Sequence, residues 1–175
     1  MQSPIIQTPR LVLRPHRLSD FDAMAAMWRE PQIVRYISGK PSTREQSWMR
    51  LLRYVGHWSL LDYGYWVIED RQTGEFAGEC GFADFHRDID PPLDGMPEMG
   101  WMIAPRFQGK GYATEGIVAC LTWGARHFPA GTTFACIITP DNLASVRVAE
   151  KCGFRLREET TYLGDAVGLY TRDAV

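Results

Sequence analysis

The residues most suited to chemistry lie at 106–115, where Arg-Phe-Gln-Gly-Lys-Gly-Tyr-Ala-Thr-Glu joins a β-like run to an amphipathic helical pattern. The first turn of a helix has unpaired amides and the positive end of the helix dipole, and it therefore attracts anions. Gly109 and Gly111 lack the Cβ that would keep a phosphate from the backbone, whereas Lys110 could add positive charge or simply be solvated. The segment predicts an anion site, because an ordinary helix start would not need two glycines.

Neither of the common nucleotide-binding motifs fits this turn. A P-loop needs four residues between its first glycine and Gly-Lys-Ser/Thr, whereas Lys110 is followed by Gly111. A Rossmann fingerprint needs a third glycine where Thr114 stands, and it follows the first strand of a parallel unit rather than the third strand of a meander. A nucleotide-dependent kinase or dehydrogenase is therefore disfavoured.

Hydrophobic patterning predicts the elements that position the turn. Strands are predicted at residues 11–14, 65–68, 76–82, 98–103, 133–138, 154–159 and 166–171. Helices are predicted to begin near Ser19, to run from a Ser42/Glu45 capping box to about Trp58, to span about 111–127, and to run from Asp141 or Asn142 to Gly153. Strands that are first antiparallel and then joined through helices predict an α/β fold, with a mixed, mostly antiparallel sheet of about six to seven strands covered on both faces.

Size and composition narrow the class of protein. The 175 residues, 45% apolar and 23% charged, predict one domain over 1–175, and a formal charge of −2 without charged runs makes nucleic acid an unexpected partner. The N-terminus lacks a signal-peptide pattern, and no stretch approaches the roughly 20 apolar residues of a membrane span. We therefore expect a soluble cytoplasmic protein that does not bind membranes.

Cysteine and histidine usage predicts no metal site. Both residue types are scattered, and none of the spacings resembles a zinc knuckle, a dithiol redox site or a His-Glu-x-x-His motif. The residues concerned are Cys80, Cys120, Cys136, Cys152, His16, His57, His86 and His127. We interpret the cysteines as reduced core residues.

Arg106-x-x-Gly109-x-Gly111 matches the Arg/Gln-x-x-Gly-x-Gly/Ala pyrophosphate loop of the GNAT acetyltransferase superfamily. The chain resembles the RimJ/RimL-like subgroup, which includes the ribosomal-protein N-terminal acetyltransferases. Three blocks carry the resemblance in the family's order: an opening strand at 8–15, the loop region at 100–115, and an Asn-x-x-Ser helix closing in Gly-Phe at 141–154. The resemblance implies a GNAT-type sheet that is splayed in the middle.

The resemblance also implies acetyl-CoA as cosubstrate, bound in a V-shaped opening near Met102 and residues 134–138. The pyrophosphate would be held by the backbone amides of Gln108, Gly109, Lys110, Gly111, Tyr112 and Ala113. Met102 and Ile103 would pair their backbone with the pantetheine arm, and Asn142 would hydrogen-bond to it from the other side. Capping of the helix is the alternative role for Asn142, and the two roles are compatible.

The family's chemistry is direct attack of a neutral amine on the thioester, which needs a general base. Glu98 is the first choice, because it precedes the loop on the same strand face as Gly100 and Met102 and the subgroup often carries glutamate there. Glu79 on the neighbouring strand is the second candidate. Either residue could instead be a solvated carboxylate on a strand.

The acid that protonates the leaving thiolate is less clearly marked. Many GNAT enzymes carry a tyrosine seven residues after the helix asparagine, and Ala149 stands there in this sequence. The RimL-like pattern suggests Ser145 as the replacement, both as an acid and near the cofactor. Its hydroxyl could equally bond to the backbone, and solvent could protonate the thiolate.

The resemblance implies an acceptor that is a primary amine, either a protein N-terminus or a small molecule. Residues 28–58 and the loop at 84–97 would recognise it, and the aspartates of that loop would favour a cationic amine unless they form only an acidic surface. The alternative function is a non-catalytic acyl-CoA-binding or sensing module, which Ala149 supports and Glu98 and Ser145 oppose. Dimers are common in the family, so a homodimer is possible.

Overall fold

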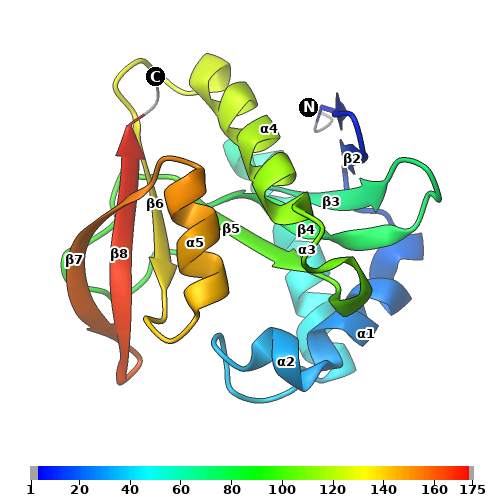
Figure 1. The fold of residues 1–175 in the computed structure, drawn as a ribbon, viewed down its shortest axis with the longest axis horizontal. Coiled ribbons are helices and arrows are strands. Elements are labelled where there is room, and N and C mark those ends of the chain that lie inside the picture. Colours follow the sequence, from blue (N-terminus) through cyan, green and yellow to red (C-terminus); the bar gives the residue numbers. More distant parts are fainter. Residues whose placement is uncertain (1–3, 174–175) are drawn as a thin grey trace.

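A computed structural model describes residues 4–173, which contain one eight-stranded sheet (Figure 1). The strands lie in the order β1-β2-β3-β4-β5-β6-β8-β7, and every neighbouring pair is antiparallel except β5 and β6. Their bounds are β1 (Ile6–Gln7), β2 (Leu11–Arg14), β3 (Tyr65–Asp70), β4 (Phe76–Ala83), β5 (Glu98–Ile103), β6 (Thr133–Ile138), β7 (Arg155–Tyr162) and β8 (Asp165–Asp173). The predicted mixed, mostly antiparallel sheet is confirmed.

Helices cover both faces of this sheet, as the alternation of elements predicted (Figure 1). They are α1 (Phe21–Arg29), α2 (Pro31–Val34), α3 (Arg44–Leu61), α4 (Tyr112–His127) and α5 (Leu143–Lys151), with short 3-10 turns η1 (Leu18–Asp20) and η2 (Pro105–Phe107). None of the helices in the described part of the chain is both long and apolar enough to cross a membrane.

The parallel pair β5 and β6 parts almost at once. Its register contains a single pair, Glu98 with Ala135, next to a 3.2 Å hydrogen bond from the Ala135 amide to the Pro97 carbonyl. Beyond that point the two strands diverge, and α5 starts on the far side of the gap (Figure 1). The splay implied by the family resemblance is therefore present, and it leaves backbone of both strands without a strand partner.

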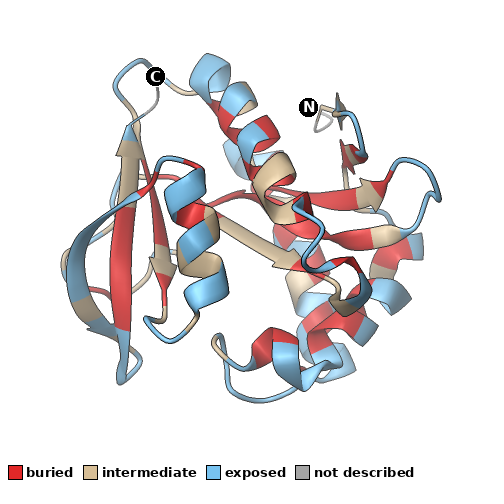
Figure 2. Ribbon diagram, in the orientation of Figure 1, coloured by how far each residue is buried: buried red, intermediate tan, exposed pale blue. Residues whose placement is uncertain are grey.

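Two apolar clusters divide the core. One lies under α4 and includes Trp66, Phe82 and Ile117, and it contains the four cysteines, all of which are buried and free as predicted. The other lies under α1 and α3 and includes Trp28 and Tyr54. Nearly all residues of β3 and β4 are buried, whereas β7 is mostly exposed (Figure 2). The buried centre of the sheet therefore contains β3 and β4, and β4 lies next to the splayed pair β5 and β6.

Helix α3 departs from the predicted capping box. Its N-cap is Thr43, whose hydroxyl accepts from the Gln46 amide while the Gln46 side chain accepts from the Thr43 amide. The Ser42/Glu45 box was wrong by one residue, because the Ser42 amide is already bonded to the Trp28 carbonyl at 2.9 Å. Both pairs satisfy the same sequence rule, so only the tertiary contact selects between them.

Two further elements were not predicted. Strand β1 has two residues, too few for a periodic pattern, and α2 is a single turn that begins at Pro31. About six to seven strands were expected, and with β1 the sheet has eight. The predicted Asn142 cap and the left-handed Gly153 at the end of α5 are both confirmed.

A buried charge cluster joins the end of β2 to the start of α1. Arg14 forms two 2.8 Å hydrogen bonds to Asp20 and a 2.6 Å bond to Glu69, and the Arg17 amide donates to Asp20 at 2.7 Å. Burial opposes ionisation of Asp20, but the bonds from Arg14 and Arg17 outweigh it and lower its pKa. The cluster therefore stabilises the fold only while Asp20 is ionised.

We predict that Asp20→Asn lowers the free energy of unfolding at neutral pH by about 3 kcal/mol, because it leaves part of a buried charge unpaired. Since the pKa of Asp20 is lowered by folding, its contribution is complete at neutral pH and is lost as pH falls below about 4. Urea unfolding at pH 7 and pH 3 measures both effects. Asp22→Asn, which removes the exposed pair with Arg44, is the matched control and should change stability by less than about 0.5 kcal/mol. Equal effects of the two substitutions would contradict this account.

Candidate active site

The predicted anion loop has a backbone conformation that requires glycine at two positions. Gly109 and Gly111 have φ of 74° and 80°, a left-handed conformation that side chains with a Cβ rarely adopt. Gly111 is the N-cap of α4, and the loop residues from Gln108 to Gly111 are exposed. The amides of the first helical turn therefore face the surface beside the end of β5, where an anion could reach them.

Side chains tie this loop to the start of β2 and the end of β3. The Tyr112 hydroxyl donates to Asp70 at 2.5 Å, and the Arg10 guanidinium donates to the Lys110 carbonyl at 2.7 Å. The bond from Tyr112 and the amides of Thr73 and Gln72 lower the pKa of Asp70, so the carboxylate remains charged. Tyr112, predicted only as a backbone donor, thus also anchors the loop through its side chain.

Glu115 is a second anchor that the sequence reasoning missed. Its carboxylate accepts from the Thr8 hydroxyl at 2.6 Å, from the Arg10 amide at 2.9 Å and from the Arg10 side chain at 2.6 Å. Burial opposes its ionisation, but these bonds outweigh burial and lower the pKa of Glu115. The available signal was that Thr8 and Arg10 lie in the block at 8–15, which resembles the opening strand of the family.

The face of β5 that carries Glu98 also carries Gly100 and Met102, as predicted. Met102 is paired in register with Glu79, Gly100 with Gly81, and Gly81 with Tyr65. A Cβ at Gly100 would overlap the Tyr65 hydroxyl, so this glycine lets the tyrosine side chain reach β5, whereas a Cβ at Gly81 would overlap the backbone of residues 64 and 65. The hydroxyl of Tyr65 is therefore placed beside the backbone of β5, close to the start of the splay.

Glu98 itself is held by an arginine from the loop that precedes β5. Arg87 donates to its two oxygens at 2.7 and 2.8 Å and also lies over the Tyr162 ring, at 4.9 Å from its centroid. Glu98 is 7% exposed, so it is neither solvated nor sealed. Burial alone would lower the pKa of Arg87, but the bonds to Glu98 raise it, and the pair is ionic. The loop at 84–97, which is rich in aspartate, therefore also places a positive charge beside Glu98.

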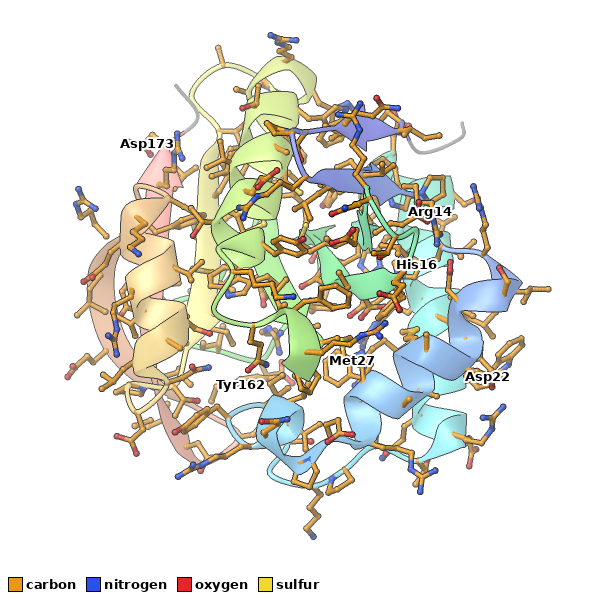
Figure 3. All side chains as sticks on the ribbon, turned by 45° about the vertical axis from the view of Figure 1, so that its right-hand side comes forward. Arg14, His16, Asp22, Met27, Tyr162 and Asp173 are labelled. Atoms are coloured by element: carbon orange, nitrogen blue, oxygen red, sulfur yellow. The ribbon has the colours of Figure 1, made fainter. Side chains whose placement is uncertain are left out.

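Glu79 occupies a different environment. It is 0% exposed, its Oε1 lies 2.9 Å from His16 Nε2, and its Oε2 accepts from the Trp28 indole at 3.0 Å. Figure 3 shows His16 just beyond the end of β2, on the side of the sheet where α1 lies. Both oxygens of Glu79 are thus occupied by protein donors. The expectation of a solvated carboxylate is wrong for this residue, because α1 covers it.

The backbone of β5 alternates in direction. The Pro97 carbonyl bonds toward β6, whereas a Cβ at Gly78 of β4 would overlap the Met102 carbonyl. Residues 97, 99, 101 and 103 therefore direct their backbone toward the splay, and Met102 directs its carbonyl toward β4. The Ile103 carbonyl accepts from the Gln108 side chain at 2.9 Å, which links the end of β5 to the anion loop.

Across the splay, α5 begins with Asn142, whose Oδ1 accepts from the Ser145 amide at 3.2 Å. This leaves the amide NH2 of Asn142 for another partner, so capping and ligand binding are compatible. Within residues 4–173 the Ser145 hydroxyl makes no hydrogen bond to protein, and Ala149 is buried in the core. The geometry thus frees the Ser145 hydroxyl rather than using it in the cap.

The structure brings the predicted residues together around the splay: the loop at the end of β5, the Glu98 face beside it, and the α5 start opposite. The sequence reasoning missed the side chains that set the charge state and shape of this site, namely Tyr65, Arg87, His16 and Trp28. No local motif marks them, because each contact joins segments that are distant in the chain. The described residues contain no group of three His, Cys, Asp or Glu side chains that could hold a metal ion.

An anion loop at the end of one strand of a splayed parallel pair is the architecture of a transferase that uses acetyl-CoA. The chain belongs to the GNAT acetyltransferase family, because the family's model, described as "Acetyltransferase (GNAT) domain", matches residues 10–155. It is an acetyl-CoA-dependent acetyltransferase.

Individual relatives agree with this assignment. YnaD of Bacillus subtilis (strain 168), named as an uncharacterized N-acetyltransferase, is 38% identical over 150 residues, covering 86% of this chain and 82% of YnaD. A GNAT-family acetyltransferase structure from Bordetella pertussis is 32% identical with a TM-score of 0.85, covering 97% of this chain and 99% of the other. The ribosomal L7/L12 acetyltransferase RimL in complex with coenzyme A has the same fold, with a TM-score of 0.79 at 21% identity, covering 97% and 98% of the two chains.

We predict that Gly100→Ala destabilises the protein by about 1–3 kcal/mol, because the new methyl group must displace the Tyr65 hydroxyl. Tyr65→Phe removes that hydroxyl and leaves the nearest ring carbon 3.0 Å from the Cβ, so the cost of Gly100→Ala should be smaller in the Tyr65→Phe background. Urea unfolding of the four proteins of this double-mutant cycle measures the difference. An equal cost in both backgrounds would show that the two residues do not share this space.

Proposed function

We propose that this enzyme transfers the acetyl group of acetyl-CoA to a primary amine, with Glu98 as the general base. The observation that carries the proposal is the position of Glu98. It is the β5 member of the single pair that precedes the splay, and it lies on the same strand as the anion loop. A base at this point would be next to the place where the pantetheine arm ends.

The residues around the splay fit acetyl-CoA. The left-handed glycines leave the amides of residues 109–113 open for the pyrophosphate, whereas the Gln108 amide, also expected to bind it, already donates to the Pro105 carbonyl at 3.2 Å. A Cβ at Gly109 would meet nothing within 4 Å, so the loop is shaped by φ rather than by packing. Ile103 would offer its backbone to the pantetheine arm as expected, but the Met102 carbonyl points toward β4, so Trp101 rather than Met102 would offer the other backbone groups. Asn142 would donate from α5. RimL, which has the same fold, is described in complex with coenzyme A, and this supports coenzyme A as a ligand of the fold.

In the proposed mechanism the thioester supplies an activated acyl carbon, and this chain supplies positioning and proton transfer. Glu98 accepts a proton from the acceptor ammonium, which frees the nitrogen lone pair for attack. A carboxylate has about four acceptor sites, and Arg87 occupies two of them, so the acceptor can bond to Glu98 without displacing Arg87. Arg87 thus acts as a positioning residue that fixes the orientation of Glu98.

Glu98 is a better candidate for the base than Glu79. Both oxygens of Glu79 are bonded to protein donors and the side chain is fully buried, so a substrate ammonium could not reach it without movement of α1. We infer that Glu79 instead orders Trp28 and His16. Ser145 would relay to the leaving thiolate the proton that the attacking nitrogen loses as the amide forms, because its hydroxyl lies one turn from Asn142 and has no partner in the described protein.

We expect Glu98→Gln to lower kcat by about 100-fold or more while leaving the affinity for acetyl-CoA unchanged. Turnover is followed by release of free thiol and by the mass of the acetylated amine, and affinity by calorimetric titration. The matched variant is Glu79→Gln, which should lower the melting temperature but keep most of the turnover. Normal turnover by Glu98→Gln, or loss of turnover only in Glu79→Gln, would refute the assignment of the base. A wild-type protein that binds acetyl-CoA but acetylates no amine would favour the non-catalytic alternative.

The anion loop yields a separate prediction. Gly109→Ala should weaken acetyl-CoA binding at least tenfold, because strain at φ of 74° would shift the loop amides. Gly131→Ala is the matched control: its φ is 82°, it also has nothing within 4 Å of the new Cβ, and it lies in a turn away from the splay. Both variants should lose similar stability, about 1 kcal/mol, but only the first should lose affinity. Equal affinities would contradict a role of this loop in binding.

A further inference from the structure

We propose that Arg50 binds a carboxylate on the acceptor, so that the preferred substrates are amines that also carry a carboxylate group. This inference rests on the proposed acetylation of an amine. It names the class of that amine.

Arg50 is an inward-facing arginine without an acidic partner. It is half-buried on α3, and its Cζ lies 3.5 Å from the centroid of the Trp28 ring. Within residues 4–173 its guanidinium makes one hydrogen bond, a 3.5 Å contact with the Ser42 hydroxyl, and no carboxylate oxygen lies within 4.0 Å. A guanidinium has five donors, so most of its hydrogen-bonding capacity is unused.

Two other inward-facing arginines, Arg14 and Arg87, do have acidic partners. Arg14 is bonded to Asp20 and Glu69, and Arg87 is bonded to Glu98. Burial lowers the pKa of Arg50, although nearby Tyr54 and Glu79 partly oppose the effect. The protein therefore holds one positive charge in a partly dehydrated place without its own counter-charge. A planar fork of donors in such a place is suited to binding a carboxylate through two parallel hydrogen bonds.

The position of Arg50 connects it to the face of β5 where Glu98 lies. Trp28, which Arg50 covers, donates to Glu79, and Glu79 is paired in register with Met102. One turn further along α3, Tyr54 stacks on Tyr65 at 4.4 Å between ring centroids. Arg50, through Trp28, and the β5 face, through the Tyr65 hydroxyl at Gly100, thus border the same cluster of aromatic rings. An extended acceptor could place its amine at Glu98 and its carboxylate at Arg50.

The charges of the layer favour a carboxylate over a purely cationic acceptor. The sequence suggested that the aspartates of the loop at 84–97 attract a cationic amine, but Arg87 from this loop neutralises Glu98. Arg50 supplies one positive charge, which a monoanionic carboxylate balances, whereas a phosphate monoester dianion would leave an excess negative charge close to Glu79 on the other side of Trp28. A single carboxylate is therefore the best match.

The experiment measures kcat/KM for pairs of amines that differ only in whether a carboxylate is replaced by its amide. The panel contains an α-amino acid, ω-amino acids of increasing chain length, and peptides with Glu or Gln at the second position, with a polyamine and a phosphorylated amine for comparison. The first two sets test a carboxylate on a small molecule, and the peptides test a carboxylate on a protein N-terminus.

In the wild-type enzyme at least one carboxylate member should exceed its amide by about tenfold or more. Arg50→Met should remove that preference by raising KM for the acid while leaving the amide unchanged. Arg50→Lys, which keeps the charge but not the fork, should have an intermediate effect. Arg44→Met, on the exposed part of the same helix, is the control and should leave both members unchanged.

Equal kcat/KM values for all acids and amides in the wild type, or a preference for the polyamine or the phosphorylated amine, would overturn the inference and leave the proposed function intact. An equal loss for acid and amide in Arg50→Met would also overturn it. A wild type that shows an acetyl-CoA-dependent melting shift but acetylates nothing in the panel would count against both proposals. If Arg50→Met does not fold, the wild-type comparison and Arg50→Lys decide the question.

Discussion

The parallel pairing of β5 and β6 stops after one residue pair, and most of the site depends on that interruption. Two strands that separate inside a sheet expose amides and carbonyls that must find other partners, because unpaired buried backbone groups are costly. On one side the Ile103 carbonyl accepts from Gln108, and on the other side Asn142 starts a new helix. The remaining backbone of the splay is what an extended amide-bearing ligand such as the pantetheine arm can satisfy. The family membership of the chain agrees with this use of the opening.

The surroundings of the splay are arranged to keep one carboxylate available and another one sealed. Glu98 is fixed by Arg87 and remains near the opening, whereas Glu79 is closed off by His16 and Trp28. Glycine at position 100 leaves room for the Tyr65 hydroxyl beside β5, the strand that carries Glu98. Arg50, which has no carboxylate partner among the described residues, stacks on Trp28 of the same aromatic cluster. On the proposed function, this separates proton transfer, at Glu98, from recognition of the acceptor, at Arg50.

Local signals in the sequence predicted most of the fold. The strands at 11–14, 98–103 and 133–138 have the predicted bounds, and the Asn142 cap and Gly153 stop are where the pattern put them. These elements carry their own periodicity or capping residues. The Ser42 box failed because two overlapping motifs were equally good and a contact with Trp28 decided between them. The splay was inferred from family resemblance only, since no property of the β5 or β6 sequence reports that their pairing ends.

The residues of the candidate site divide in the same way. Residues of the loop and of α5 lie in contiguous motifs, whereas the partners of the two glutamates come from residues 16, 28 and 87 and could not be paired without the fold.

The central claim is that the splay and its loop bind acetyl-CoA. Thermal unfolding with and without acetyl-CoA, with ATP and NAD as controls, tests it most directly. At 100 times its dissociation constant a ligand adds about 2.7 kcal/mol, so the melting temperature should rise by roughly 5 to 11 °C with acetyl-CoA alone. No shift at saturating acetyl-CoA, or an equal shift with ATP, would contradict the account.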